Sequence, residues 1–286
     1  SGKTTVLIHK MVWSVLQHRK KLGGRARVLY ISYSDRLKTQ AYSDANDIIE
    51  IIHDESKEVH RDNMHFEQMR ELLKNEVGNQ NLFPDANHIE FGKFKDWYIK
   101  KFERDHQTRN IPAERAWFAI RLLKGVHGEG APRHGRYPGG KRGEEEIVRQ
   151  MKNNKLLGRW GDDDKKRQAS ILLRYQDWIK DENGWDDLDL ARRAHSELIG
   201  GKGDSTIYHE IFCDEAQDFT EIELAYLKEK CSKEPMWPTK FGYCLNLAGD
   251  DMQTINPTGF DWDAFLESWE SEATLQPNLI YLSQNE

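Results

Sequence analysis

Three short apolar runs, rich in β-branched and aromatic residues, each end abruptly in polar residues. They are "RVLYIS" at 27–32, "TIYHEIFC" at 206–213 and "FGYCLNLAG" at 241–249. Runs of this length and composition predict buried strands, and the stretches that separate them show the apolar spacing of helices. Strands that alternate with helices are typical of an α/β domain built on a parallel sheet. The sequence therefore predicts an α/β fold.

Periodic stretches predict helices elsewhere, and these dominate the middle of the chain. Apolar residues recur at helical spacing over 4–21, 35–53, 63–77, 92–105, 112–124, 144–157, 165–181, 187–199, 220–231 and 262–269. A last strand is predicted over 278–283, and the Gly-, Pro- and Arg-rich interval 125–143 predicts a loop. We therefore divide the chain into an α/β domain, residues 1–97 and 206–286, and a mostly helical insertion, residues 98–205.

Composition limits the class of protein. The chain has 286 residues, of which 37% are hydrophobic and 31% charged, with a formal net charge of −6. This length suffices for one large domain or two medium ones with a core. No stretch approaches the ~20 apolar residues of a membrane span, so we expect no membrane partner. The negative net charge gives no general attraction to nucleic acid but leaves a local basic groove open.

The three cysteines, Cys213, Cys231 and Cys244, are an odd number without Cys-x-x-Cys spacing. This argues against a disulfide framework or a zinc site built from cysteines, and for a reducing compartment. The first residues do not form a signal peptide, so we expect a cytoplasmic or nucleoid-associated protein. Because the chain begins without Met and stops just after an apolar run, we also expect a fragment of a longer protein.

The N-terminal residues "SGKTT" match the second half of the phosphate-binding loop, G-x-x-x-x-G-K-[ST], directly before a predicted helix. In such a loop Gly2 lets the backbone approach a phosphate, Lys3 reaches the β- and γ-phosphates, and the Thr4 hydroxyl holds Mg²⁺. Thr5 completes the candidate nucleotide-binding set. Taken alone, these few residues are equally compatible with an ordinary helix start.

The predicted strand that ends in "IFC" leads directly into Asp214, Glu215, Gln217 and Asp218. Carboxylates at the end of a buried run are costly unless they have a partner. In phosphate-binding-loop enzymes, the strand-end Asp holds Mg²⁺ and another polar group orients the attacking water. We therefore assign these roles to Asp214 and Glu215. An acidic first helical turn, favoured by the helix dipole, would also place carboxylates here, but it does not explain the order D-E-A-Q-D beside a lysine-bearing loop.

A third segment, "LAGDDMQTI" at 247–255, again ends an apolar run in Asp250, with Gln253 three residues later. A Gln at this place can donate a hydrogen bond to a γ-phosphate, although Gly-Asp-Asp is also a common turn. The carboxyl ends of parallel strands are where α/β folds bind ligands. The three segments together therefore predict an ATP and Mg²⁺ site, with Gln253 among the catalytic residues and Asp250 among those that bind nucleotide.

In this combination the chain resembles the UvrD/Rep-like group of superfamily 1 helicases. The resemblance rests on "GKTT", "VLYISYSDRL", "DEAQDF", "GDDMQTI" and "YLSQN", in the order expected for that group. It covers the ends of the chain and leaves the helical middle unmatched. It implies a P-loop NTPase (RecA-like) domain with a helical insertion, truncated at both ends. Such a domain belongs to an ATP-driven motor that moves along single-stranded DNA, and a second RecA-like domain would be its partner. The resemblance implies that Gln253 couples the γ-phosphate to DNA binding and that Gln217, in the nucleotide-binding set, belongs to the same coupling layer.

The resemblance also implies DNA contacts. The segment "ISYSDRL" corresponds to the family's first DNA motif, in which Ser32 would bond a phosphate and Tyr33 would stack on a base. Base stacking tolerates any sequence, as a motor requires. Tyr33 fits equally well as a half-buried aromatic at a strand end. Phe91 and Phe94 stand where the family has a second DNA motif, which here lacks its usual Thr and His.

Two departures from the family pattern bear on activity. After Gln253 the family continues with a Tyr and a Trp near the DNA, whereas here Phe260 or Trp262 would take that role, unless Trp262 is an ordinary core residue. The final motif should continue with Tyr and Arg, but Asn285 is followed by Glu286. The arginines of that motif and of the second domain are then missing. An arginine finger is worth about 10³–10⁵ in rate, so we expect this chain alone to be nearly inactive.

Two alternative functions stay open. One is an ATP-gated DNA-binding regulator without processive unwinding, and the other is the motor part of a helicase–nuclease or defence complex. The intact "DEAQD" favours hydrolysis over sensing alone. In the insertion, "RHGRYPGGKRG" at 133–143 carries four Arg and Lys residues among glycines. It predicts either contact with a DNA backbone or a solvated loop.

Overall fold

Four parallel strands lie at the centre of the protein, whose computed structural model describes residues 2–22, 27–52, 62–102, 111–128, 131–132, 135–231 and 245–250. The strands are β1 (Val28–Ser32), β2 (Met64–Gln68), β3 (Glu210–Cys213) and β4 (Leu245–Leu247), in the order β2-β1-β3-β4. Each pairs in parallel with its neighbour. The prediction of an α/β domain with a parallel sheet is confirmed, and each predicted strand among the described residues is found, with shorter bounds.

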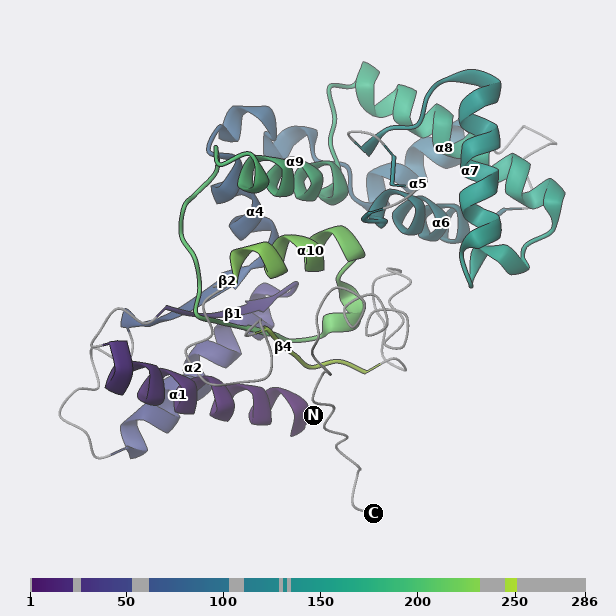
Figure 1. The fold of residues 1–286 in the computed structure, drawn as a ribbon. Coiled ribbons are helices and arrows are strands. Elements are labelled where there is room, and N and C mark those ends of the chain that lie inside the picture. Colours follow the sequence, from purple (N-terminus) through teal and green to yellow (C-terminus); the bar gives the residue numbers. More distant parts are fainter. Residues whose placement is uncertain are drawn as a thin grey trace, which may run out of the picture.

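Helices cover both faces of this sheet (Figure 1). On one face lie α1 (Gly2–Leu22) and α2 (Asp35–Ile51), and on the other lie α4 (Met69–Val77), α9 (Asp187–Ile199) and α10 (Glu221–Lys230). Successive strand residues point to opposite faces, and β1 shows this directly. Val28 and Tyr30 pack with α1 and α2, whereas Leu29 and Ile31 pack with the helices of the other face.

One predicted helix, 63–77, is wrong in its first third. Residues 64–68 form β2, which pairs with β1 from Val28↔Met64 to Ser32↔Gln68, and only Met69–Val77 is helical. The apolar spacing of this stretch does not distinguish the two states. Its strand state depends on the neighbouring β1 backbone, to which it donates and from which it accepts hydrogen bonds at the sheet edge.

A separate group of helices lies beside the sheet in Figure 1. It contains α5 (Phe91–Phe102), α6 (Ala113–Gly125), α7 (Gly140–Asn153) and α8 (Asp162–Asp181), which we call the helical body. Its core is aromatic, since Phe94 packs against both Trp117 and Tyr175. The large helical portion that the sequence predicts is therefore present. Short 3-10 turns complete the described structure: η1 (Gln80–Leu82), η2 (Asp85–Asn87), η4 (Leu157–Arg159) and η5 (Ala216–Asp218).

The chain enters and leaves the helical body through two connections that lie side by side. Ile89 N donates to Trp185 O at 2.7 Å, and Trp185 N donates to Asn87 O at 3.2 Å. The apolar cluster of the helical body begins at Ile89, whereas α9 packs with the sheet. Packing therefore groups α5 with the insertion and α9 with the sheet, while the predicted insertion, 98–205, starts later and ends beyond α9.

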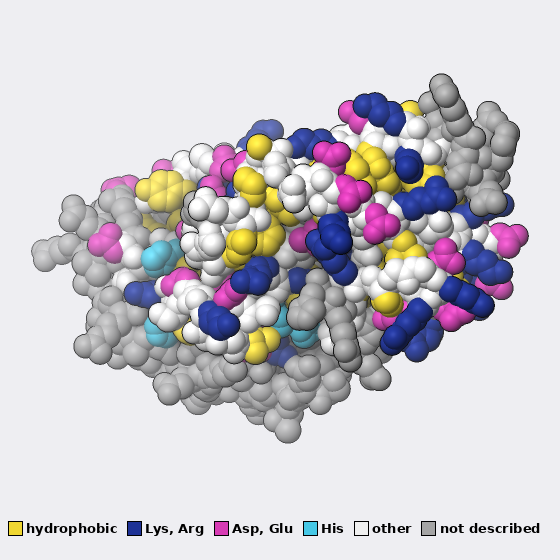
Figure 2. Space-filling model, turned by 90° about the horizontal axis from the view of Figure 1, so that it is seen from above, with side chains coloured by type: hydrophobic (Ala, Val, Ile, Leu, Met, Phe, Trp, Pro, Cys, Tyr) yellow, Lys and Arg dark blue, Asp and Glu magenta, His cyan; other side chains and the backbone are white. Residues whose placement is uncertain are grey.

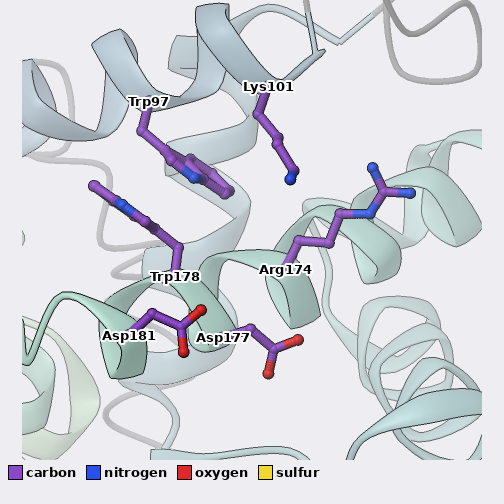
Figure 3. A pocket seen from close by; sticks show the side chains of 6 residues that line it. All are labelled: Trp97, Lys101, Arg174, Asp177, Trp178 and Asp181. Carbon is purple, nitrogen blue, oxygen red and sulfur yellow. The ribbon is translucent and has the colours of Figure 1, made fainter.

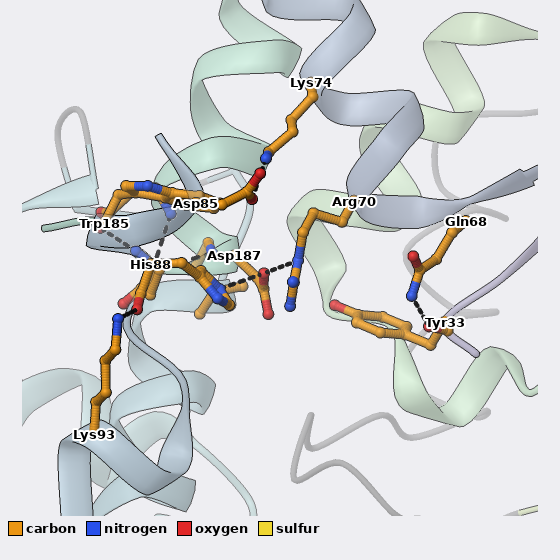
Figure 4. Close-up of polar contacts among 12 residues, drawn as sticks. Tyr33, Gln68, Arg70, Lys74, Asp85, His88, Lys93, Trp185 and Asp187 are labelled. Carbon is orange, nitrogen blue, oxygen red and sulfur yellow. Dashed lines mark hydrogen bonds and ion pairs between the residues drawn. The ribbon is translucent and has the colours of Figure 1, made fainter. Parts of the chain in front are cut away.

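A layer of polar side chains joins these two connections to the sheet (Figure 4). Asp187, the first residue of α9, accepts from His88 Nε2 at 3.0 Å and from Arg70 Nε at 3.1 Å. Burial favours the neutral acid, but the hydrogen bond from His88 and the charge of Arg70 hold the pKa of Asp187 at about 2. Trp185 packs against His88 with the rings tilted by 44° and their centroids 4.4 Å apart. The connections are thus fixed by backbone pairing and by charge.

No helix in the described part of the chain is long and apolar enough to cross a membrane. Cys213 and Cys231, the two described cysteines, are buried, and neither forms a disulfide within the described residues.

Candidate functional site

The three sequence segments singled out above meet at the carboxyl ends of β3 and β4. Lys3, in the first turn of α1, forms an ion pair with Asp250, with Nζ 3.0 Å from Oδ2. The neighbouring Thr4 donates its hydroxyl to Asp214 Oδ2 at 2.9 Å. Residues separated by more than two hundred positions in the chain therefore share one site. Helix α1 starts at this site, so its first backbone N–H groups are presented to it.

Asp214 is the most enclosed of the carboxylates in the site, with 1% of its surface exposed. Its Oδ2 accepts from the Tyr30 hydroxyl at 2.8 Å as well as from Thr4, and its Oδ1 accepts from Glu215 N at 3.0 Å. Burial and then the Asp214 charge raise the pKa of Tyr30 well above its ordinary value. Tyr30 is a site residue that the sequence analysis missed. The available signal was a tyrosine inside a buried strand, since a buried phenol needs a hydrogen-bond partner.

Glu215 has an unusual backbone, with φ 52° and ψ 49°. This left-handed conformation costs a residue with a Cβ of order 1–3 kcal/mol and is retained only where the surroundings impose it. Here the next residue, Ala216, donates its N–H to Ala248 O at 2.8 Å, which ties the turn to the end of β4. The turn directs the half-buried Glu215 side chain towards Gln217, whose Nε2 donates to Glu215 Oε2 at 2.6 Å.

Gln217 bridges the ends of two strands. Its amide nitrogen bonds Glu215, and its carbonyl oxygen accepts from Asp250 N at 2.9 Å. Gln217 itself is 1% exposed, and both bonds join it to half-buried partners. Gln217 therefore fixes the Glu215 carboxylate relative to Asp250 and, through Asp250, relative to Lys3.

The other predicted nucleotide-site residues divide into two groups. Gly2 and Thr5 lie exposed in the first turn of α1, and a Cβ at Gly2 would meet no described atom within 4 Å. Gln253 lies outside the described residues, as do the predicted DNA residues Phe260 and Trp262, so the roles of all three stay predictions.

The predicted DNA residues at the end of β1 are both held by the protein. Ser32 is fully buried, and its Oγ accepts from Ser34 N at 3.2 Å. Tyr33 is half-buried, donates its hydroxyl to Glu223, and packs edge-on against Phe219 with centroids 4.9 Å apart. Gln68 Nε2 also donates to Tyr33 O at 2.8 Å (Figure 4). Tyr33 thus has a fixed orientation beside the sheet end.

Phe91 and Phe94 lie in α5 and not at the sheet end. Phe94 is completely buried in the helical body, and the half-buried Phe91 ring lies 6.3 Å from that of Trp117. The structure therefore does not bring these residues together with Ser32 and Tyr33.

A buried acid on α10 connects the sheet end with the helical body. Glu223 accepts from Thr220 N at 2.8 Å and from Thr220 Oγ1 at 2.6 Å, which caps the helix. Burial raises the pKa of Glu223, although the charge of Arg121 opposes the shift. Arg121 comes from α6 and is 5% exposed. Neither residue was predicted, because only the fold places α6 against α10.

Two oxygen atoms in the site suit Mg²⁺. No group of three or more His, Cys, Asp or Glu side chains that would hold a metal ion occurs among the described residues. Mg²⁺ often uses only one or two carboxylates, with phosphates and waters completing its six ligands. The Thr4 hydroxyl and the Asp214 carboxylate, 2.9 Å apart, fit that limited protein contribution.

Comparison with known proteins adds no family. No family model matches the chain, and no curated protein matches it. The structure itself establishes an α/β fold with a parallel sheet of order β2-β1-β3-β4 and a large helical portion.

Proposed function

We propose that this chain is the ATP-binding, P-loop domain of a DNA-dependent ATPase that moves along single-stranded DNA. The observation that carries the proposal is the meeting of Lys3 and Thr4 with Asp214 and Asp250 at the carboxyl ends of two parallel strands. This is the place where α/β folds bind ligands. A lysine, a hydroxyl and two carboxylates at the start of a helix are what a Mg²⁺–triphosphate needs.

Each side chain has a role that its contacts support. Lys3 would exchange Asp250 for the terminal phosphates, and Thr4 and Asp214 would hold Mg²⁺. When bound, the metal would neutralise charge that develops on the phosphates. Glu215 would orient the attacking water and accept its proton, with the carboxylate held in place by Gln217. Gln253 would contact the γ-phosphate, as the sequence predicts.

The DNA part of the proposal rests on the sequence resemblance and on the place of Tyr33. Tyr33 directly follows β1, whose buried Tyr30 bonds Asp214 in the nucleotide site. A change at Asp214 would therefore reach the DNA residue through one short strand. Single-stranded DNA or a single-strand/duplex junction would be the partner, together with a second RecA-like domain that completes the ATP site.

The test is ATP hydrolysis by the full-length protein, measured with and without single-stranded DNA, beside a Lys3→Ala variant. We expect DNA to stimulate hydrolysis and the variant to lose both nucleotide binding and stimulation. Nucleotide binding without DNA-stimulated turnover would indicate an ATP-gated regulator and not a motor. Absence of nucleotide binding would refute the proposal.

A pair of Tyr33 substitutions tests the DNA contact. Tyr33→Phe keeps the ring and removes the hydroxyl that bonds Glu223, whereas Tyr33→Ala removes both. Because base–aromatic stacking contributes about 1–3 kcal/mol per base, we expect Tyr33→Ala to weaken single-stranded DNA binding by about 5- to 150-fold. Tyr33→Phe is expected to retain most of the binding. Fluorescence anisotropy with a labelled oligothymidylate measures both, and equal losses in the two variants would contradict a stacking role.

A further inference from the structure

Two adjoining cavities lie on the helical body, away from the site described above. The larger, of about 490 Å³, is lined by α5 and α8 (Figure 3), and the smaller, of about 210 Å³, lies between α8 and the start of α7. Asp177 lines both of them. The two cavities therefore form one continuous surface along α8.

The larger cavity combines an aromatic wall with cations. Trp97 and Trp178 stack face to face, with centroids 4.8 Å apart and an interplanar angle of 11°, and both remain half-buried. Figure 3 shows the indoles at one end of the cavity and Lys101 and Arg174 at the other. An exposed indole surface beside positive charge suits a ligand with a planar ring and an anionic group.

The smaller cavity has the features of an anion site. Helix α7 begins there at Gly140, with no capping side chain and no acidic residue in its first turn. Gln176, only 9% exposed, lines this cavity, and its Nε2 has no hydrogen-bond partner among the described residues. The exposed side chains of Arg136 and Lys180 add two cations. A buried unpartnered donor is costly, and the free N–H groups of a helix start favour an anion beside it.

The glycine-rich start of α7 is held in a fixed shape. Gly140 has φ +69°, a conformation that favours glycine. A Cβ at Gly143 would lie 1.8 Å from the carbonyl oxygen of Pro138, so no other residue fits there without moving the backbone. The helix start that faces the cavity is therefore preformed.

We propose that this surface binds a nucleotide unit of single-stranded nucleic acid, with its base on the Trp97–Trp178 pair and its phosphate in the smaller cavity. Asp177 and Asp181 line the larger cavity and would accept hydrogen bonds from the N–H groups of the base. Their charge opposes phosphate binding and sets an upper limit on affinity. Figure 2 shows Lys and Arg side chains gathered over the same end of the molecule, interspersed with acidic ones. The proposal does not depend on ATP binding at the sheet.

The test measures binding of a fluorescein-labelled oligothymidylate to the full-length protein without nucleotide, in a Tyr33→Ala background that removes the contact at the sheet end. We expect Trp178→Leu to weaken binding by about 5- to 150-fold and Trp178→Phe to retain most of it. Lys180→Glu is expected to weaken binding and to reduce the slope of log K against log salt by about one. Asp177→Asn is expected to tighten binding.

Lys166→Glu is the matched control, because Lys166 is exposed on the same helix and lines neither cavity. Equal effects of Lys180→Glu and Lys166→Glu would overturn the proposal, as would unchanged binding in Trp178→Leu with an unchanged melting temperature. Competition by thymidine monophosphate and by inorganic phosphate shows whether the surface recognises a strand, a free nucleotide or phosphate alone. If the mononucleotide displaces the oligonucleotide at low concentration, the proposal of a single-stranded ligand is wrong, and the surface binds a free nucleotide.

Discussion

Glu215→Gln is expected to lower DNA-stimulated ATP hydrolysis by about 10²–10⁴-fold while ATP binding is retained, because loss of a general base has effects of this size. The amide keeps the shape of the side chain and one oxygen for the hydrogen bond from Gln217, so the turn should survive. What the variant loses is the ability to accept a proton from water. Steady-state hydrolysis and equilibrium binding of a fluorescent ATP analogue separate the two effects.

Glu182→Gln is the control for this variant, since Glu182 is an exposed residue at the end of α8 and far in sequence from the site. Its hydrolysis should equal that of the unchanged protein. If Glu215→Gln retained full turnover, the assignment of Glu215 as the base would be wrong. A parallel loss of nucleotide binding would instead indicate a structural role for the Asp214–Gln217 turn.

Lys124→Met is expected to reduce the free energy of unfolding by about 3–5 kcal/mol, the usual effect of removing one partner from a buried ion pair. Lys124 is 2% exposed, with Nζ 2.5 Å from Asp186 Oδ2 and 2.9 Å from Asp189 Oδ1. Burial disfavours the Lys124 charge, but Asp186 and Asp189 outweigh it and raise the pKa of Lys124. The variant removes the lysine that bonds both the buried Asp186 and the partly buried Asp189.

The pH dependence gives this prediction a distinctive sign. Without Lys124, burial raises the pKa of Asp186 and Asp189 in the folded state above their unfolded value, so the folded protein binds more protons. The loss of unfolding free energy caused by Lys124→Met should therefore shrink as the pH falls from neutral towards about 4. Urea denaturation at several pH values measures it. The exposed Lys100→Met serves as a control, and a deficit independent of pH would contradict the electrostatic cause.

A partial rescue tests the same explanation independently. Adding Asp186→Asn and Asp189→Asn to Lys124→Met removes both carboxylate charges. Asn is also an effective helix N-cap, so the capping role of Asp186 at α9 is kept. We expect the triple variant to be more stable than Lys124→Met alone.

Local chemistry made much of the fold predictable. The apolar runs around Tyr30 and Phe212 are β-rich and end in polar residues, so their strand state agrees with their burial. The apolar spacing over 187–199 predicts a helix, and α9 (Asp187–Ile199) has those bounds. The meeting of Lys3 with Asp250 follows from one rule, that parallel strands share a carboxyl edge.

What the sequence did not reveal depends on neighbours far along the chain. Met64–Gln68 becomes a strand because β1 lies beside it, and its own spacing fits a helix equally well. The contacts of Glu223 exist only because α10 packs against the end of β1 and against α6. The stacking of Trp97 on Trp178 needs α5 and α8 to cross, whereas each tryptophan alone resembles an ordinary core residue.

The paired connections at Ile89 and Trp185 have a mechanical consequence. A helical body attached by one connecting segment can rotate about that segment. Two connecting segments that are hydrogen-bonded to each other resist this rotation, so bending is the motion of lowest cost. Arg70 and His88 both bond Asp187 at the start of α9 and so fix the paired connections to that helix. The stiffest part of the attachment therefore lies against the sheet. A displacement at the sheet would therefore reach the helical body as a tilt about a single axis. The start of α8, at Asp162, would then sweep a longer arc than its end near Trp185.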